Sequence, residues 1–223
     1  LWSSSTPSTD LFEAIKPKFL DRVKNSSVSK RKDFQALAAF VLSGWLRKIK
    51  DSSSRVISSD ETRELLLIVE DDFRSEIILV YERWLLGRDG KISEDMVDAA
   101  HEFFTFVWPK QIKIKSPTVS ARLFDFAMFS LDKIEGITEM LIPLMQLNES
   151  ARIRSSHFLN VDDQSVVQRY PEEFLKLLYA ILSEEAKNWP YGVGKALPKV
   201  VEAKPGLAIN PIYIELKRRW DSR

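Results

Sequence analysis

Along most of the chain, apolar residues recur at steps of three and four, the spacing that places them on one face of a helix. The longest such stripe lies between Arg31 and Lys50 and contains Phe34, Leu37, Ala38, Val41, Leu42, Trp45, Leu46 and Ile49. Residues 111–115 alternate apolar and basic positions as a strand does, but no partner strand is visible, so we expect an extended connector there. The pattern predicts about ten helices, no sheet and a buried Trp45.

Local start and stop signals set the ends of these helices. Ser58 and Glu61 are spaced as a capping box, and the acidic residues 70–72 are expected to break the following stripe into two helices. Pro117 and Pro171 each take the first helical position, which proline favours. The predicted helices span roughly 10–23, 31–50, 60–69, 73–87, 94–108, 117–131, 137–147, 171–185, 192–203 and 210–220, with a short piece after 162–163.

The order of the helices indicates the fold class. Helix pairs recur at a spacing of roughly 40 residues, as they do in HEAT-type repeats. We therefore expect an all-α fold, an α-solenoid-like stack of HEAT-type helix pairs, with an irregular helical bundle as the alternative. Residues 1–9 are polar and linker-like, and residues 10–223 are expected to form a single helical-repeat domain. Because the chain starts at Leu1 and not at Met, we expect a fragment of a longer protein.

The composition narrows the class of protein. The 223 residues include 33 basic and 32 acidic side chains, and this balance argues against a dedicated nucleic-acid binder, which usually carries a clear basic excess. The chain has no cysteine, which excludes disulfides and thiolate metal sites and fits a cytoplasmic, reducing location. No apolar run approaches the roughly 20 residues that a membrane-spanning helix needs, so we expect no membrane partner.

Residues equipped for catalysis are few. The chain holds two histidines, and His101 lacks the second histidine, at helical spacing, with which a metalloprotease shares its zinc. The carboxylate pairs at 162–163 and 184–185 lie at predicted helix ends, where such residues commonly cap helices or face solvent. We therefore expect no catalytic, metal-binding or cofactor-binding residues here, and any activity of a longer protein would belong to another domain.

Aromatic and basic side chains supply the candidate binding surface. Aromatic residues between 103 and 129 cover more than one helix face, so some are expected in the core and others in an exposed patch. Basic groups that converge on one concave face would bind phosphates, which makes a nucleic-acid-binding helical repeat the alternative function. The candidate partner-binding residues are Phe103, Phe106, Trp108, Lys113, Lys115, Arg152, Arg154, Trp189 and Tyr191.

A sharp corner is predicted near the end of the chain. Pro190 cannot continue a helix, and Gly192 tolerates a positive φ. We expect this corner to fold the last two helices back onto the helix that begins at Pro171. The expected receiving face is Phe174, Leu175, Leu178, Tyr179 and Leu182, and the expected returning residues are Val193, Leu197, Val200, Val201, Ile212, Ile214 and Leu216.

The last quarter of the chain also carries a family resemblance. Its segments are Tyr-Pro-Glu-Glu-Phe-Leu-Lys-Leu-Leu from Tyr170, Trp-Pro-Tyr-Gly from Trp189, Pro-Gly-Leu-Ala from Pro205 and Glu-Leu-Lys-Arg-Arg from Glu215. This region resembles the C-terminal helical part of large bacterial anti-phage defence proteins, which carry an N-terminal effector, often a sirtuin-like NAD-consuming domain. The resemblance implies a non-enzymatic tail that senses a phage component or mediates assembly. Its partner would be a protein or a phage-derived ligand, with oligomers formed through other domains.

Overall fold

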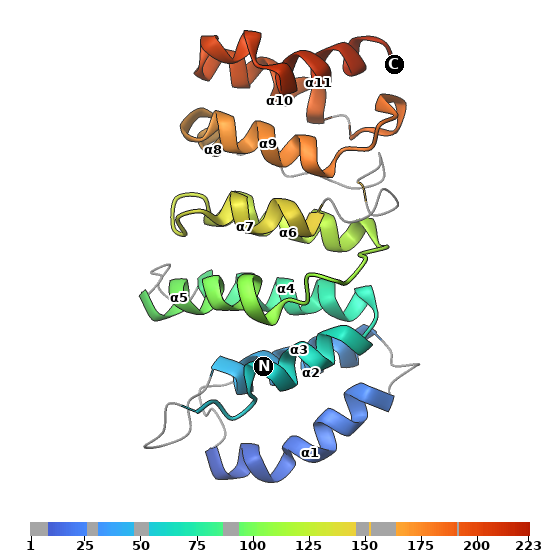
Figure 1. Cartoon of the computed structure of the whole chain (residues 1–223), viewed down its shortest axis with the longest axis vertical. Helices are drawn as coiled ribbons and strands as arrows, with labels where there is room; N and C mark the ends of the chain where they lie inside the picture. Colours follow the sequence, from blue (N-terminus) through green and yellow to red (C-terminus); the bar gives the residue numbers. More distant parts are fainter. Residues whose placement is uncertain are drawn as a thin grey trace. The chain divides into compact units, whose positions relative to one another are not determined.

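A computed structural model describes residues 9–25, 31–46, 54–86, 94–145, 152, 164–190 and 192–223. Every regular element in these ranges is helical (Figure 1). The predicted all-α class is therefore confirmed. The chain divides into two compact units, residues 1–109 and residues 110–223, and each is described by itself. The assignment of residues 10–223 to one helical-repeat domain stays a prediction.

The first unit contains five α-helices among its described residues, and the fifth runs into a short π-helix. The elements are α1 (Thr9–Asn25), α2 (Arg31–Leu46), α3 (Ser59–Ile68), α4 (Asp71–Leu86), α5 (Glu94–Glu102) and the π-helix η1 (Phe103–Val107). α2 packs mainly against α4, and α3 packs against η1. Trp45 is fully buried, as the sequence predicts, and its indole lies edge-on to the rings of Tyr81 and Phe103.

The predicted capping box and helix break in the first unit are both confirmed. The Ser58 hydroxyl accepts a hydrogen bond from the Glu61 amide (3.1 Å), and the Glu61 carboxylate accepts one from the Ser58 amide (2.8 Å). Partial burial raises the pKa of Glu61, but hydrogen bonds from Lys16 and Ser58 outweigh it and hold that pKa below its usual value. Arg74 closes the break between α3 and α4, because its guanidinium donates to the carbonyl of Leu66 (2.9 Å) and to Asp71 (2.7 Å).

The second unit is a stack of helices whose neighbours in sequence pack together. Its elements are α6 (Pro117–Ser130), α7 (Ile137–Met145), α8 (Gln164–Arg169), α9 (Pro171–Ile181), η3 (Ala186–Asn188), α10 (Gly192–Ala203), η4 (Pro205–Ile209) and α11 (Pro211–Asp221). α6 packs against α7, α9 packs against α7 and α8, and α10 and α11 both pack against α9 (Figure 1). Residues 112–116 lead into α6 without forming a helix or a strand, as expected of a connector; Ile112 and Ile114 are buried, and Lys113 and Lys115 are exposed.

Three details of the sequence prediction are wrong. The helix that was expected to reach Trp108 changes to π-helical geometry at Phe103, where the Trp108 amide bonds the Phe103 carbonyl at 2.7 Å. α9 ends at Ile181 and not near 185, because Leu182 adopts extended geometry. Gly192 begins α10 as predicted, but it does not adopt the positive φ that was allowed for it; among the described glycines, Gly136 has a positive φ.

The predicted return of the last two helices is confirmed in most of its residues. Of the expected receiving residues, Phe174, Leu175 and Leu178 on α9 and Leu182 just past its end are buried. On the returning helices, Val193, Leu197, Val200 and Leu216 are buried. Tyr179 and Ile214 were expected inside this contact but are exposed. They occupy helix edges that the neighbouring helices do not cover.

Candidate functional site

Three of the aromatic residues proposed as partner contacts are core residues instead. Phe103, Trp108 and Trp189 are each at most 2% exposed. The Phe103 ring lies 5.3 Å from Tyr81 and 6.3 Å from Trp108, centroid to centroid. Their burial contradicts their choice as partner contacts, because side chains packed between helices offer no surface to a partner. Sequence could not separate them from exposed aromatics, since apolar residues occupy nearly every position from 103 to 108.

Phe106 behaves differently from its neighbours. It is 70% exposed, whereas Phe103, Phe104 and Val107 of the same π-helix are buried. The π-helix therefore presents one large aromatic ring to solvent on a turn whose other residues are buried or half-buried. Such π-helical turns are frequent at functional sites.

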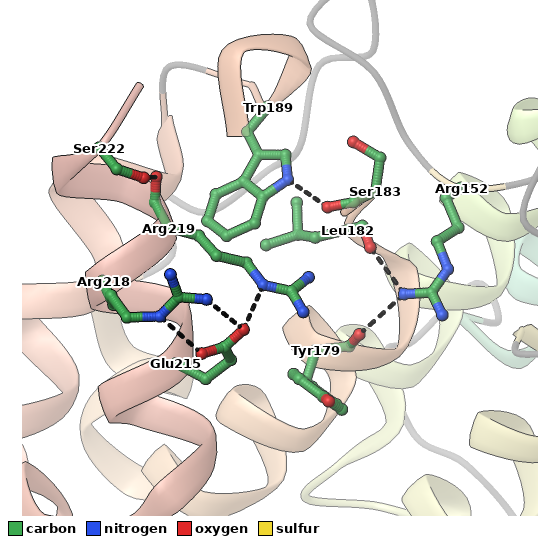
Figure 2. Close-up of polar contacts among 9 residues, drawn as sticks. All are labelled: Arg152, Tyr179, Leu182, Ser183, Trp189, Glu215, Arg218, Arg219 and Ser222. Atoms are coloured by element: carbon green, nitrogen blue, oxygen red, sulfur yellow. Dashed lines mark hydrogen bonds and ion pairs between the residues drawn. The ribbon is translucent and has the colours of Figure 1, made fainter. Parts of the chain in front are cut away.

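Trp189 has a structural role in the second unit. Its indole N–H donates to the Ser183 carbonyl at 2.6 Å (Figure 2). Its ring also stacks on Trp220, with centroids 6.5 Å apart. Gly194 allows Trp220 to lie against α10, because a β-carbon at Gly194 would stand 2.1 Å from the Trp220 Cζ2 atom. The guanidinium of Arg223 covers Trp220 at 3.3 Å from its ring centroid. These contacts join the corner after α9 to the end of α11.

The described candidate basic residues differ in their surroundings. Lys113 and Lys115 are exposed on the connector before α6. Arg152 donates hydrogen bonds to the carbonyls of Leu182 (2.8 Å) and Tyr179 (3.5 Å), so it satisfies the C-terminal end of α9 (Figure 2). Arg154 and Tyr191, the other two candidates, lie outside the described residues.

Acidic partners neutralise the basic cluster at the end of α11. Arg218 binds the Glu215 carboxylate through both Nε (3.0 Å) and Nη2 (2.9 Å), and Arg219 Nε binds it at 2.6 Å (Figure 2). These hydrogen bonds, with Arg218 contributing most, lower the pKa of Glu215 to about 2. Lys217 pairs with Asp221. The cluster therefore offers phosphates less positive charge than its sequence suggests.

A cleft of about 510 Å³ in the first unit was not found by sequence reasoning. Its walls come from the ends of α2 and α4, from the segment before α3, and from α5. Its lining includes Arg55, Trp84, Asp95, Met96, Asp98 and Glu102. No sequence signal marks this cleft, because Arg55 meets Glu102 only after residues 47 positions apart are brought together by folding.

Arg55 is held in place by contacts on two sides. Its guanidinium lies 3.9 Å above the Trp45 ring and pairs with the Glu102 carboxylate. Glu102 also accepts a hydrogen bond from the Ser59 hydroxyl (2.8 Å), and that hydroxyl accepts from the Trp45 indole N–H (3.2 Å). Burial raises the pKa of nearby Tyr81 well above its usual range; the charge of Arg55 opposes this shift and that of Glu102 adds to it. The floor of the cleft is thus a fixed polar network on an aromatic core.

The described residues lack two further features, a cluster of metal ligands and a membrane-spanning helix. They contain no group of three or more His, Cys, Asp and Glu residues placed to hold a metal ion. No helix among them has the length and apolar content to span a bilayer.

Comparison with known proteins identifies a distant relative. The chain is 25% identical over 157 residues to the uncharacterized protein y4cA of Sinorhizobium fredii (strain NBRC 101917 / NGR234). The match covers 70% of this chain and 13% of the relative, so the chain spans only a small part of that protein's length. No protein-family model matches the chain. No solved structure matches it either.

Proposed function

We propose that this chain is a non-enzymatic helical interaction domain of a larger bacterial defence protein, and that it binds a phage component or mediates assembly. The observation that carries the proposal is Phe106, which is 70% exposed on a π-helical turn whose other residues are buried or half-buried. Large aromatic side chains anchor protein interfaces because they bury much apolar area at little cost in conformational entropy. A partner that covers Phe106 would remove that ring from water.

Two further observations support an interaction domain of a longer protein. The matched part of the Sinorhizobium fredii protein is 13% of its length, which is the relation expected between one module and a large multidomain chain. The resemblance of the last quarter of the chain to the tails of anti-phage proteins makes a phage component the first partner to test. The nucleic-acid alternative has weaker support, because Arg218, Arg219 and Lys217 are paired with carboxylates.

Site-specific photocrosslinking tests the proposal. The photoreactive residue p-benzoylphenylalanine replaces Phe106 in the protein expressed from its complete reading frame, in bacteria with and without phage infection. Arg63, an exposed residue of α3 in the same unit, receives the same replacement as the matched control. We expect a discrete covalent adduct from position 106 that is absent from position 63, and mass spectrometry identifies its partner. Equal labelling at both positions, or none at 106 under either condition, contradicts the proposal.

A further inference from the structure

The cleft of the first unit has a net negative charge. Of its four charged lining residues, Asp95, Asp98 and Glu102 are acidic and Arg55 is basic. Arg55 pairs with Glu102, so these two charges offset each other. Asp95 and Asp98 lie three residues apart on α5 and are exposed. They give the lining of the cleft two exposed carboxylates that can pair with a cation.

The cleft also has an apolar wall beside these carboxylates. Trp84 is 38% exposed, and Leu46, Met96 and Ala99 complete the lining. A volume of about 510 Å³ lies within the range of roughly 300–1,000 Å³ that is usual for ligand pockets. A charged head with an apolar stem therefore suits this cleft better than a bare metal ion or a polyanion.

We propose that this cleft binds an arginine side chain presented by a partner protein. A guanidinium pairs with carboxylates through its planar fork and also stacks on an aromatic face, and Asp95, Asp98 and Trp84 offer both kinds of contact. The methylene stem of the arginine would lie along Leu46 and Met96. The chain already contains one such arrangement, since Arg55 stacks on Trp45 while it pairs with Glu102.

This inference rests on the proposed role as a protein-binding domain but uses different residues. Phe106 does not line the cleft. Failure of the crosslink at Phe106 would therefore leave the cleft untested, and failure of arginine binding would leave the crosslinking result unchanged. Each experiment therefore tests one proposal independently of the other.

Fluorine NMR tests the cleft directly. The chain is labelled with 5-fluorotryptophan, and the Trp84 resonance is assigned by its loss in Trp84→Phe. The probe is Nα-acetyl-arginine N-methylamide, and the matched probe is its citrulline analogue, which keeps the shape and removes the charge. We expect a saturable shift of the Trp84 resonance with arginine, a much smaller one with citrulline, and weaker binding as salt screens the pair.

Paired variants distinguish binding in the cleft from general electrostatic attraction of arginine to acidic residues. Asp95→Asn with Asp98→Asn keeps side-chain size and should weaken arginine binding by about three-fold or more, since each exposed ion pair contributes modestly. Glu64→Gln with Asp72→Asn removes the same charge from exposed positions outside the cleft lining and should leave binding unchanged. Circular dichroism melts establish that all variants are folded. The proposal is overturned by equal shifts with citrulline, by no saturable shift with arginine, or by equal losses in both double variants.

Discussion

Gly194 lies so close to Trp220 that the sign of the stability change in Gly194→Ala tests the packing of the second unit. In an exposed helix interior, Gly→Ala stabilises a protein by up to about 1 kcal/mol, because alanine has the better helix propensity. Here the new methyl group would lie 2.1 Å from Cζ2 and 2.5 Å from Cε2 of Trp220, closer than any real contact. The two effects therefore oppose each other.

The size of this stability change depends on how the Trp220 ring makes room for the new methyl group. Overpacking of this kind costs about 1–3 kcal/mol, and a displaced Trp220 also loses its stack on Trp189, which is worth about 0.5–1.5 kcal/mol. Because Trp220 is only partly buried and lies near the chain end, its ring can relax, which places the total cost towards the lower end of that range. After subtraction of the helix-propensity gain, we expect Gly194→Ala to lower the free energy of unfolding by about 0.5–2 kcal/mol.

Urea unfolding followed by circular dichroism measures this change, and a second substitution identifies its cause. In a Trp220→Ala background the obstructing ring is gone, so Gly194→Ala should become neutral or stabilising. The double-mutant cycle then gives a coupling energy of about 1 kcal/mol or more. A Gly194→Ala variant that is more stable than the parent chain would refute the placement of Trp220. So would an equal loss of stability in both backgrounds.

Three further outcomes are expected. Trp45→Ala should lower the free energy of unfolding by about 3–5 kcal/mol because the side chain is fully buried, and a loss below about 1 kcal/mol in urea unfolding would contradict that burial. The folded-state pKa of Glu215 is about 2 against an ordinary value of 4.5, so its ion pairs stabilise the fold fully above about pH 4.5. This contribution is lost as the pH falls towards 2, and Glu215→Gln should therefore flatten the profile of unfolding free energy against pH in that range. An unchanged profile would count against the pairing. Truncation after Glu185 should expose Phe174 and Leu178 and cause early melting or aggregation, which calorimetry and light scattering detect; a monomer with unchanged melting would show that α10 and α11 are an independent appendage.

Local signals in the sequence predicted the helices well, because capping and proline preferences act within a few residues. Ser58 with Glu61 and Pro171 each begin a helix where the sequence places one. The burial of Trp45 followed from the spacing of its stripe. The end of α9 was missed, since residues 182–185 have no proline or glycine to mark a stop.

Surface features were predicted less well, because they depend on contacts between distant segments. Phe103 and Phe106 have the same side chain, and only the packing of α3 and α4 around η1 determines which one is buried. The cleft requires Arg55 and Glu102 to meet across 47 positions. The pairing of Arg219 with Glu215 is an exception, because its four-residue spacing is already visible in the sequence.

The corner closed by Arg74 has a consequence for the order of folding. Its hydrogen bonds to Asp71 and Leu66 join residues three and eight positions apart, whereas Lys16 and Glu61 join across 45 positions. Short loops cost little entropy to close, and local contacts speed folding. We therefore expect the α3–α4 corner to be formed already in the transition state of the first unit, and α1 to dock after it. The unit would then assemble outward from this corner.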